Sequence, residues 1–230
     1  MKLTETENSK IINYLKSYGK MYDRNLLEYI INNYEEAINK KDRLCELNQI
    51  YACLGILPRQ INTYMYYLKQ IKKSHNINSN ILEIGGGCYP ILAKYISIKQ
   101  QRCKNGNITV YDPNLVISKM EHVTLKKEKF TSKTNISNYE LLIGVMPSEA
   151  TIDLVKQATK YHKELFLVLS EFTYFANGYL GYDIPNLKEW EEYIRELIHE
   201  DTESFTIKES RVPNEYGKQY LIFDKKKNIR

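Results

Sequence analysis

Three consecutive glycines between an apolar run and a helix-forming segment constrain this chain more than any other feature. The run Ile81–Ile84 has the length and composition of a buried strand, and it leads directly into Gly85, Gly86 and Gly87. Glycines at such a turn adopt positive φ and let a ligand approach the backbone, because no Cβ is in the way. Pro90 suits the first turn of a following helix, where its missing N–H costs little. The segment therefore predicts a ligand-binding turn at the carboxyl end of a strand, where open α/β sheets bind ligands.

The spacing of apolar residues changes near residue 75 and predicts two domains. Residues 1–75 carry four apolar stripes with helical spacing and no strand pattern. The polar, turn-rich segment His75–Asn80 follows them. We therefore expect a helical N-terminal cap over residues 1–75 and a second domain over residues 76–230.

Short apolar runs alternate with helical segments in the second domain. The expected strands are 81–84, 107–111, 123–130, 140–145, 164–169, 204–210 and 219–224, and the expected helices are 90–99, 113–120, 149–161 and 187–199. Strands that alternate with helices favour a mostly parallel sheet with helices on both faces. The last two strands predict an antiparallel hairpin at one edge. The expected fold class is thus α/β, with the helical cap in front.

Two acidic residues lie at predicted strand ends around the glycine turn. Glu83 comes two residues before the first glycine, and Asp112 directly follows the strand Asn107–Tyr111. A carboxylate in the latter place can accept both hydroxyls of a ribose, since its two oxygens suit a vicinal diol. Asp112 also suits the N-cap of a helix that begins at Pro113. The dinucleotide fingerprint GxGxxG requires a glycine where this chain has Pro90, which counts against NAD.

The order of strand, Glu83, glycine turn, helix, strand and Asp112 resembles the S-adenosylmethionine-dependent methyltransferase family with a Rossmann-like fold (class I). The resemblance covers residues 81–170 by motif and order, and the closing helix and hairpin by topology. It implies a Rossmann-like domain that binds S-adenosylmethionine. It also implies that Glu83 and the three glycines contact the cofactor and that Asp112 binds its ribose.

Two segments depart from the family's pattern. The family usually has an acidic residue after the third strand that binds the adenine amino group, whereas this chain has Lys129–Ser132. Phe130 can stack on adenine there and Thr131 can hydrogen-bond to it, or both can be plain loop residues. Amino-group methyltransferases carry an Asp/Asn-Pro-Pro-Tyr-type motif after the fourth strand, whereas Gly144–Ser148 has one proline and no preceding Asn or Asp. An adenine or glutamine N-methyltransferase is therefore disfavoured, and Met146 in this segment is a cofactor-contact candidate.

A catalytic base is needed only if the methyl acceptor must lose a proton, because a sulfonium is already a strong electrophile. Glu149, after the fourth predicted strand, is the first candidate, and Glu171, after the fifth, is the second. The alternative for Glu149, which we favour, is that its charge lies in the first turn of the next helix, at the positive end of the helix dipole.

Two aromatic clusters are candidates for substrate binding. Phe172, Tyr174 and Tyr179 follow the fifth predicted strand, where the fold would place them above the cofactor. Tyr64 and Tyr67 lie in the helix that leads into the first strand of the sheet. Both clusters suit a wall for a planar substrate, and both suit ordinary core packing.

Charge and cysteine content limit the partners. The net charge of +5 is far from that of a typical nucleic-acid-binding domain, although the lysines at 126, 127 and 129 and at 225–227 are compatible with RNA. The four cysteines form no CxxC pair and have no histidine at metal-ligand spacing, so we expect no metal site. We expect free thiols, a cytoplasmic protein and no membrane contact, because neither a signal peptide nor an apolar span is recognisable.

These features favour an S-adenosylmethionine-dependent methyltransferase that acts on a small molecule, with the helical cap closing the pocket. Three alternatives remain open. One is an RNA methyltransferase that uses the lysines. Another is a nicotianamine-synthase-like enzyme, which transfers the aminocarboxypropyl group of the same cofactor. The third is a cofactor-binding regulator without catalysis.

Overall fold

The computed structural model describes residues 63–87, 90–103, 106–115, 118–170, 187–198, 205–210 and 219–224. All of them belong to one structural unit, which spans Thr63–Arg230. Most of the predicted helical cap lies outside the described residues, so the domain boundary near residue 75 stays a prediction.

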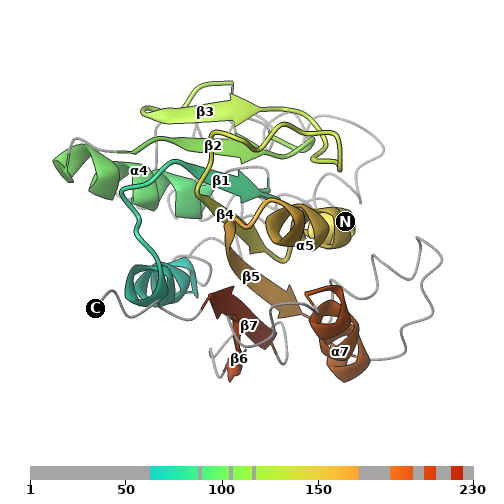
Figure 1. The fold of residues 1–230 in the computed structure, drawn as a ribbon. Coiled ribbons are helices and arrows are strands. Elements are labelled where there is room, and N and C mark those ends of the chain that lie inside the picture. Colours follow the sequence, from blue (N-terminus) through green and yellow to red (C-terminus); the bar gives the residue numbers. More distant parts are fainter. Residues whose placement is uncertain are drawn as a thin grey trace, which may run out of the picture. The chain divides into compact units, whose positions relative to one another are not determined.

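One seven-stranded sheet organises this unit, with the strand order β3-β2-β1-β4-β5-β7-β6. Strands β1 to β5 are parallel, and β7 runs antiparallel between β5 and β6 (Figure 1). The mostly parallel Rossmann-like sheet with a closing antiparallel hairpin is thus confirmed. The strands are β1 (Ile81–Ile84), β2 (Ile108–Tyr111), β3 (Val123–Lys126), β4 (Leu141–Val145), β5 (Glu164–Ser170), β6 (Phe205–Ser210) and β7 (Gln219–Asp224).

Helices cover both faces of the sheet, because the central strands are apolar on both sides. The helices α5 (Thr151–Lys160) and α7 (Leu187–Leu197) bury their apolar residues against one face, in a cluster that includes Leu82 and Leu167. The helix over residues 63–74 packs on the other face, where Tyr67 meets Phe166 of β5 edge to face. The helix α4 (Ile91–Cys103) lies on this second side as well (Figure 1).

Two predicted elements are wrong. The described residues between 113 and 120 form a turn and an isolated bridge instead of a helix. The segment is tied at both ends instead, because the Asp112 side chain accepts from the backbone N–H of Asn114 at its start and Met120 forms an antiparallel bridge with Val123 at its end. The strand expected over residues 123–130 ends at Lys126. Beyond it the chain leaves the edge of the sheet, and Phe130 turns into the core.

Candidate functional site

The strand order reverses direction at β1, which lies between β2 and β4. The chain moves outward to β2 and β3 on one side, and it returns to β4 and β5 on the other. Open α/β sheets bind ligands at such a switch point, outside the carboxyl ends of the strands. Ile84 of β1 is opposite Tyr111 of β2 and Gly144 of β4. The glycine turn, Asp112 and Met146 therefore follow three adjacent strand ends, as the sequence order predicted.

The glycine turn has a conformation that other residues adopt only with strain. Gly85 has φ +76°, and its N–H donates to the carbonyl of Tyr111 at 3.0 Å. A Cβ at Gly85 would lie 2.9 Å from the Cα of Pro147, so the backbone after β4 packs against the turn. Gly87 has φ +72°, and, its chain neighbours aside, no atom of the described residues lies within 4 Å of the place its Cβ would occupy. The turn is therefore packed at its first glycine and open at its third.

Asp112 ties the glycine turn to the end of β2. Its Oδ2 atom accepts from the N–H of Gly87 at 2.8 Å, and its Oδ1 atom accepts from the N–H of Asn114 at 2.7 Å. The residue is 6% exposed. A carboxylate has about four lone-pair sites, so about two remain for ligand hydroxyls. The role as helix N-cap is not seen, since the described residues after Asp112 form a turn.

Glu83 is a buried carboxyl group directly before the glycine turn. The pKa of Glu83 is raised from 4.5 to about 8. Burial is the largest cause, the backbone N–H of Ala93 in the first turn of α4 opposes it, and the negative charge of Asp112 adds to the rise. Its Oε2 atom is buried and has no hydrogen-bond partner among the described residues. A buried acceptor without a partner is costly, so it suggests a position for a ligand donor.

The chain is strained where β4 ends. Met146 has φ +52°, which is rare for a residue with a Cβ and is further disfavoured before a proline. Its N–H donates to the carbonyl of Val168 in β5 at 3.0 Å, which holds the residue in this conformation. Strained residues concentrate at functional sites. The sequence pattern did not predict Pro147 as a site residue, although Pro147 forms the wall against which Gly85 packs.

Glu149 lies in the 3₁₀ turn Ser148–Ala150 that leads into α5. Glu149 therefore lies in a helical turn directly before α5. The favoured alternative, a place in the first turn of the helix, is close to this position, but Glu149 is not in the first turn of α5 itself. Its Oε2 atom accepts from Nζ of Lys129 at 3.2 Å, and both side chains are more than half exposed. The pair links the segment after β3 to the segment after β4, a contact that neither sequence motif predicted.

Phe130 and Thr131 belong to the connection between β3 and β4. Phe130 is buried in the core, and its ring meets that of Tyr111 edge to face at 6.5 Å. The Thr131 carbonyl accepts from Nε2 of Gln157 in α5 at 2.6 Å, while its side chain is exposed. Their contacts with an adenine ring stay predictions, and the buried Phe130 ring has the less accessible position.

The remaining predicted residues do not gather around the glycine turn in the described part of the chain. Tyr67 is fully buried against Phe166, and Tyr64 packs edge to face on Tyr67. Tyr67 thus has the surroundings of a core aromatic on one face of the sheet, and Tyr64 is half-buried beside it. The predicted residues Glu171, Phe172, Tyr174 and Tyr179 lie outside the described residues.

Among the described residues, no group of three or more His, Cys, Asp or Glu side chains could hold a metal ion. Within the same ranges, no helix combines the length and the apolar character needed to cross a membrane.

No family model and no curated protein matches the chain. Among solved structures, it is similar to a single-residue mutant of MtNAS in complex with S-adenosylmethionine, with 12% identity, coverage of 94% of this chain and 77% of that one, and a TM-score of 0.46. It is also similar to the apo form of the S-adenosylmethionine-dependent methyltransferase SibL, with 10% identity, coverage of 94% and 74%, and a TM-score of 0.42. A 16S rRNA adenine N1-methyltransferase from Catenulisporales acidiphilia matches with 9% identity, coverage of 70% and 90%, and a TM-score of 0.42.

These likenesses are distant, so the fold assignment rests on the strand order and register described above. The chain has a Rossmann-like sheet whose switch point carries a glycine turn and two buried acidic residues, the arrangement that its resemblance to S-adenosylmethionine-dependent methyltransferases leads one to expect.

Proposed function

We propose that this protein is an S-adenosylmethionine-dependent methyltransferase that acts on a small molecule. The observation that carries the proposal is the arrangement of Glu83 and Asp112 on either side of an open glycine turn at the switch point. The site offers acceptors for hydroxyl and ammonium groups, and its third glycine leaves space for a ligand next to the backbone. Such a donor set suits a nucleoside that carries a cationic amino-acid chain.

Each residue has a distinct part in this proposal. Asp112 would accept the ribose hydroxyls with its remaining lone pairs, and Glu83 would bind the cationic amino-acid end. The glycine turn would lie against the cofactor, and Met146 would adjoin its methyl-bearing sulfur. The cofactor, when bound, supplies an electrophilic methyl group. The protein's task is then to orient the acceptor in line and to exclude water.

Glu149 remains our candidate for a general base. It lies after β4, on the same edge of the sheet as the glycine turn, and it is accessible. The ion pair with Lys129 positions its carboxyl group, which can accept a proton from an acceptor group. Glu171 is a second candidate from the sequence alone.

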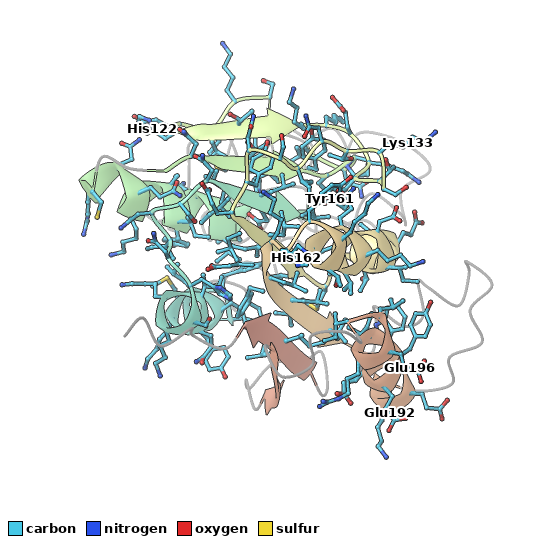
Figure 2. The ribbon with its side chains drawn as sticks, viewed as in Figure 1. His122, Lys133, Tyr161, His162, Glu192 and Glu196 are labelled. Carbon is cyan, nitrogen blue, oxygen red and sulfur yellow. The ribbon has the colours of Figure 1, made fainter. Side chains whose placement is uncertain are left out.

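An RNA substrate is the second candidate function. Lys126, Lys127, Lys129 and Lys133 are exposed on β3 and on the connection that follows it, and Figure 2 shows Lys133 at the carboxyl end of the sheet. Exposed lysines near a site can bind phosphates, and such binding weakens steeply with salt. A steep salt dependence of RNA binding, lost on replacement of these lysines, would favour this function over the small-molecule one.

Isothermal titration with S-adenosylmethionine tests the proposal directly. We expect binding by the wild-type protein and a Kd at least about tenfold higher for Asp112→Asn, because the amide offers fewer acceptor sites to the ribose. Glu196→Gln is the matched control, since it also replaces an acid by its amide, on the exposed side of α7 (Figure 2). Absence of binding, or equal affinity in all three proteins, would contradict the proposal.

The product distinguishes the remaining alternatives. A methyltransferase releases S-adenosylhomocysteine, whereas aminocarboxypropyl transfer releases methylthioadenosine. Incubation with metabolite pools and with RNA, followed by mass spectrometry of the nucleoside product, separates the two reactions. Cofactor binding without either product would indicate a regulator.

A further inference from the structure

Glu83 ends β1 with one carboxyl oxygen that the protein leaves without a partner. The residue is 2% exposed, and its Oε2 atom finds no donor among the described residues. The residues opposite Glu83 on the neighbouring strands are Val110 and Ile143, which have no polar side chains. An orphaned oxygen of this kind, on the residue two positions before Gly85, calls for a partner that the described residues do not supply, and a ligand group can be that partner.

Burial and the charge of Asp112 favour the neutral form of Glu83, and one backbone N–H opposes them. Asp112 on the β2 side is the charged group that acts on it, with the same sign, while α4 contributes the backbone N–H of Ala93. The first turn of α4 contains no acidic residue, and the β4 neighbours Ile143 and Gly144 do not titrate. Burial and Asp112 together bring the pKa of Glu83 to about 8, so its carboxyl group is mostly protonated near pH 7.

We propose that Glu83 is protonated in the free protein and releases its proton when a ligand ammonium group binds beside it, so that cofactor binding is coupled to the release of one proton. The O–H bond of the carboxyl group breaks, the proton passes to the buffer, and the resulting carboxylate pairs with the ammonium. A neighbouring cation favours the charged form of a carboxyl group, which provides the driving force. This inference rests on the proposed function. It adds that the ligand must carry a positively charged group beside Glu83.

Three related nucleosides distinguish which positively charged group of the ligand, the ammonium or the sulfonium, is the partner of Glu83. S-adenosylmethionine has both an ammonium and a sulfonium group, and S-adenosylhomocysteine has the ammonium alone. Methylthioadenosine has neither. If the ammonium is the partner of Glu83, the first two ligands release a proton on binding and the third does not.

Calorimetric titration in two buffers of different ionisation enthalpy, both near pH 7, measures the protons released per ligand bound. We expect close to one proton for S-adenosylmethionine and for S-adenosylhomocysteine, and none for methylthioadenosine. Glu83→Gln should bind S-adenosylmethionine more weakly and without proton release, whereas Glu196→Gln should behave as the wild type. For the wild type, affinity should rise with pH below about 8, by up to about tenfold per pH unit.

The outcomes separate this inference from the function on which it rests. Binding of S-adenosylmethionine to the wild type without proton release overturns the inference and leaves the proposed function in place. Proton release that persists in Glu83→Gln assigns the proton to another group and also overturns it. If none of the three nucleosides binds, both fail. The pH dependence of wild-type affinity tests the inference even if the Glu83 variant does not fold.

Discussion

At the scale of single residues, the site depends on groups that stability alone would not favour. Glu83 is a buried acid with an unpartnered oxygen, and Met146 is a non-glycine residue with positive φ. A buried neutral acid and a strained backbone each cost free energy of folding. Both lie at the carboxyl ends of adjacent strands, where a ligand would bind.

The pKa of Glu83 predicts how stability depends on pH. Because its pKa is raised in the folded state, from 4.5 to about 8, the folded protein binds more protons than the unfolded chain between these values. Stability must therefore fall as pH rises from about 4.5 to 8, by at most about 1.4 kcal/mol per pH unit from this group. Urea unfolding of Glu83→Gln across this range should lack that slope, and Glu196→Gln should retain it. Parallel curves for the wild type and Glu83→Gln would contradict the raised pKa.

Two glycines of the turn should respond differently to alanine. Gly85→Ala combines a positive φ with a clash against the Pro147 backbone, so we expect a loss of about 2–5 kcal/mol in unfolding free energy. Gly87→Ala meets open space, so the loss should be about 1–2 kcal/mol. The folded Gly87→Ala protein should nevertheless bind S-adenosylmethionine with a higher Kd than the wild type, because the added methyl group enters the space proposed for the ligand. Unchanged affinity of folded Gly87→Ala would place the ligand elsewhere.

At the scale of elements, α5 holds the connection between β3 and β4 in place. Gln157 Nε2 donates to the Thr131 carbonyl at 2.6 Å, and Asp153 Oδ2 accepts from the N–H of Ser132 at 3.1 Å. Phe130 anchors the same connection in the core. These contacts determine where the connection runs past the carboxyl edge of the sheet.

Removal of the Gln157 contact should loosen this connection. We expect Gln157→Ala to lose about 0.5–1.5 kcal/mol in unfolding free energy, because the Thr131 carbonyl loses one of its two donors and keeps the backbone N–H of Thr134. Amide hydrogen exchange should quicken over residues 127–136 and remain unchanged in β1 and β4. Lys156→Ala, an exposed position on the same helix, is the control. A uniform change in exchange over the whole unit would argue against a local role.

At the scale of the whole molecule, the helix over residues 63–74 is part of the sheet domain. Tyr67, Leu68 and Ile71 are buried, and Tyr67 packs on Phe166 of strand β5. His75, just after this helix, has a fully buried side chain whose Nδ1 atom lies 3.2 Å from Oε2 of Glu164, the first residue of β5. The sequence-based boundary near residue 75 would cut through this packing.

Two truncated proteins test that boundary. A chain that begins at Thr63 should keep the near-UV circular dichroism and cooperative unfolding of the sheet domain. A chain that begins at Asn76 should lose several kcal/mol of stability, because the sheet face under Tyr67 and Ile71 becomes exposed. Equal stability of the two truncated chains would support the boundary near residue 75 instead.

Local patterns predicted much of the fold and the outline of the site. The apolar run before the glycines is a strand, and the acids Glu83 and Asp112 lie at the expected strand ends. These features depend on neighbouring residues, because the spacing of apolar residues and the presence of glycines determine strands and turns within a few positions of the chain. The helix expected at 113–120 is wrong, since the backbone N–H of Asn114 donates to the Asp112 side chain in a turn and Met120 pairs with Val123.

The sequence by itself determined the alternation of strands and helices, the glycine turn and the two acids beside it. Only the tertiary structure decided that burial raises the pKa of Glu83, that Pro147 forms a wall of the turn, and that Lys129 pairs with Glu149. The physical reason is that burial and pairing depend on which distant segments meet. A carboxyl group's charge, a glycine's space and an ion pair are properties of those contacts, and no local pattern contains them.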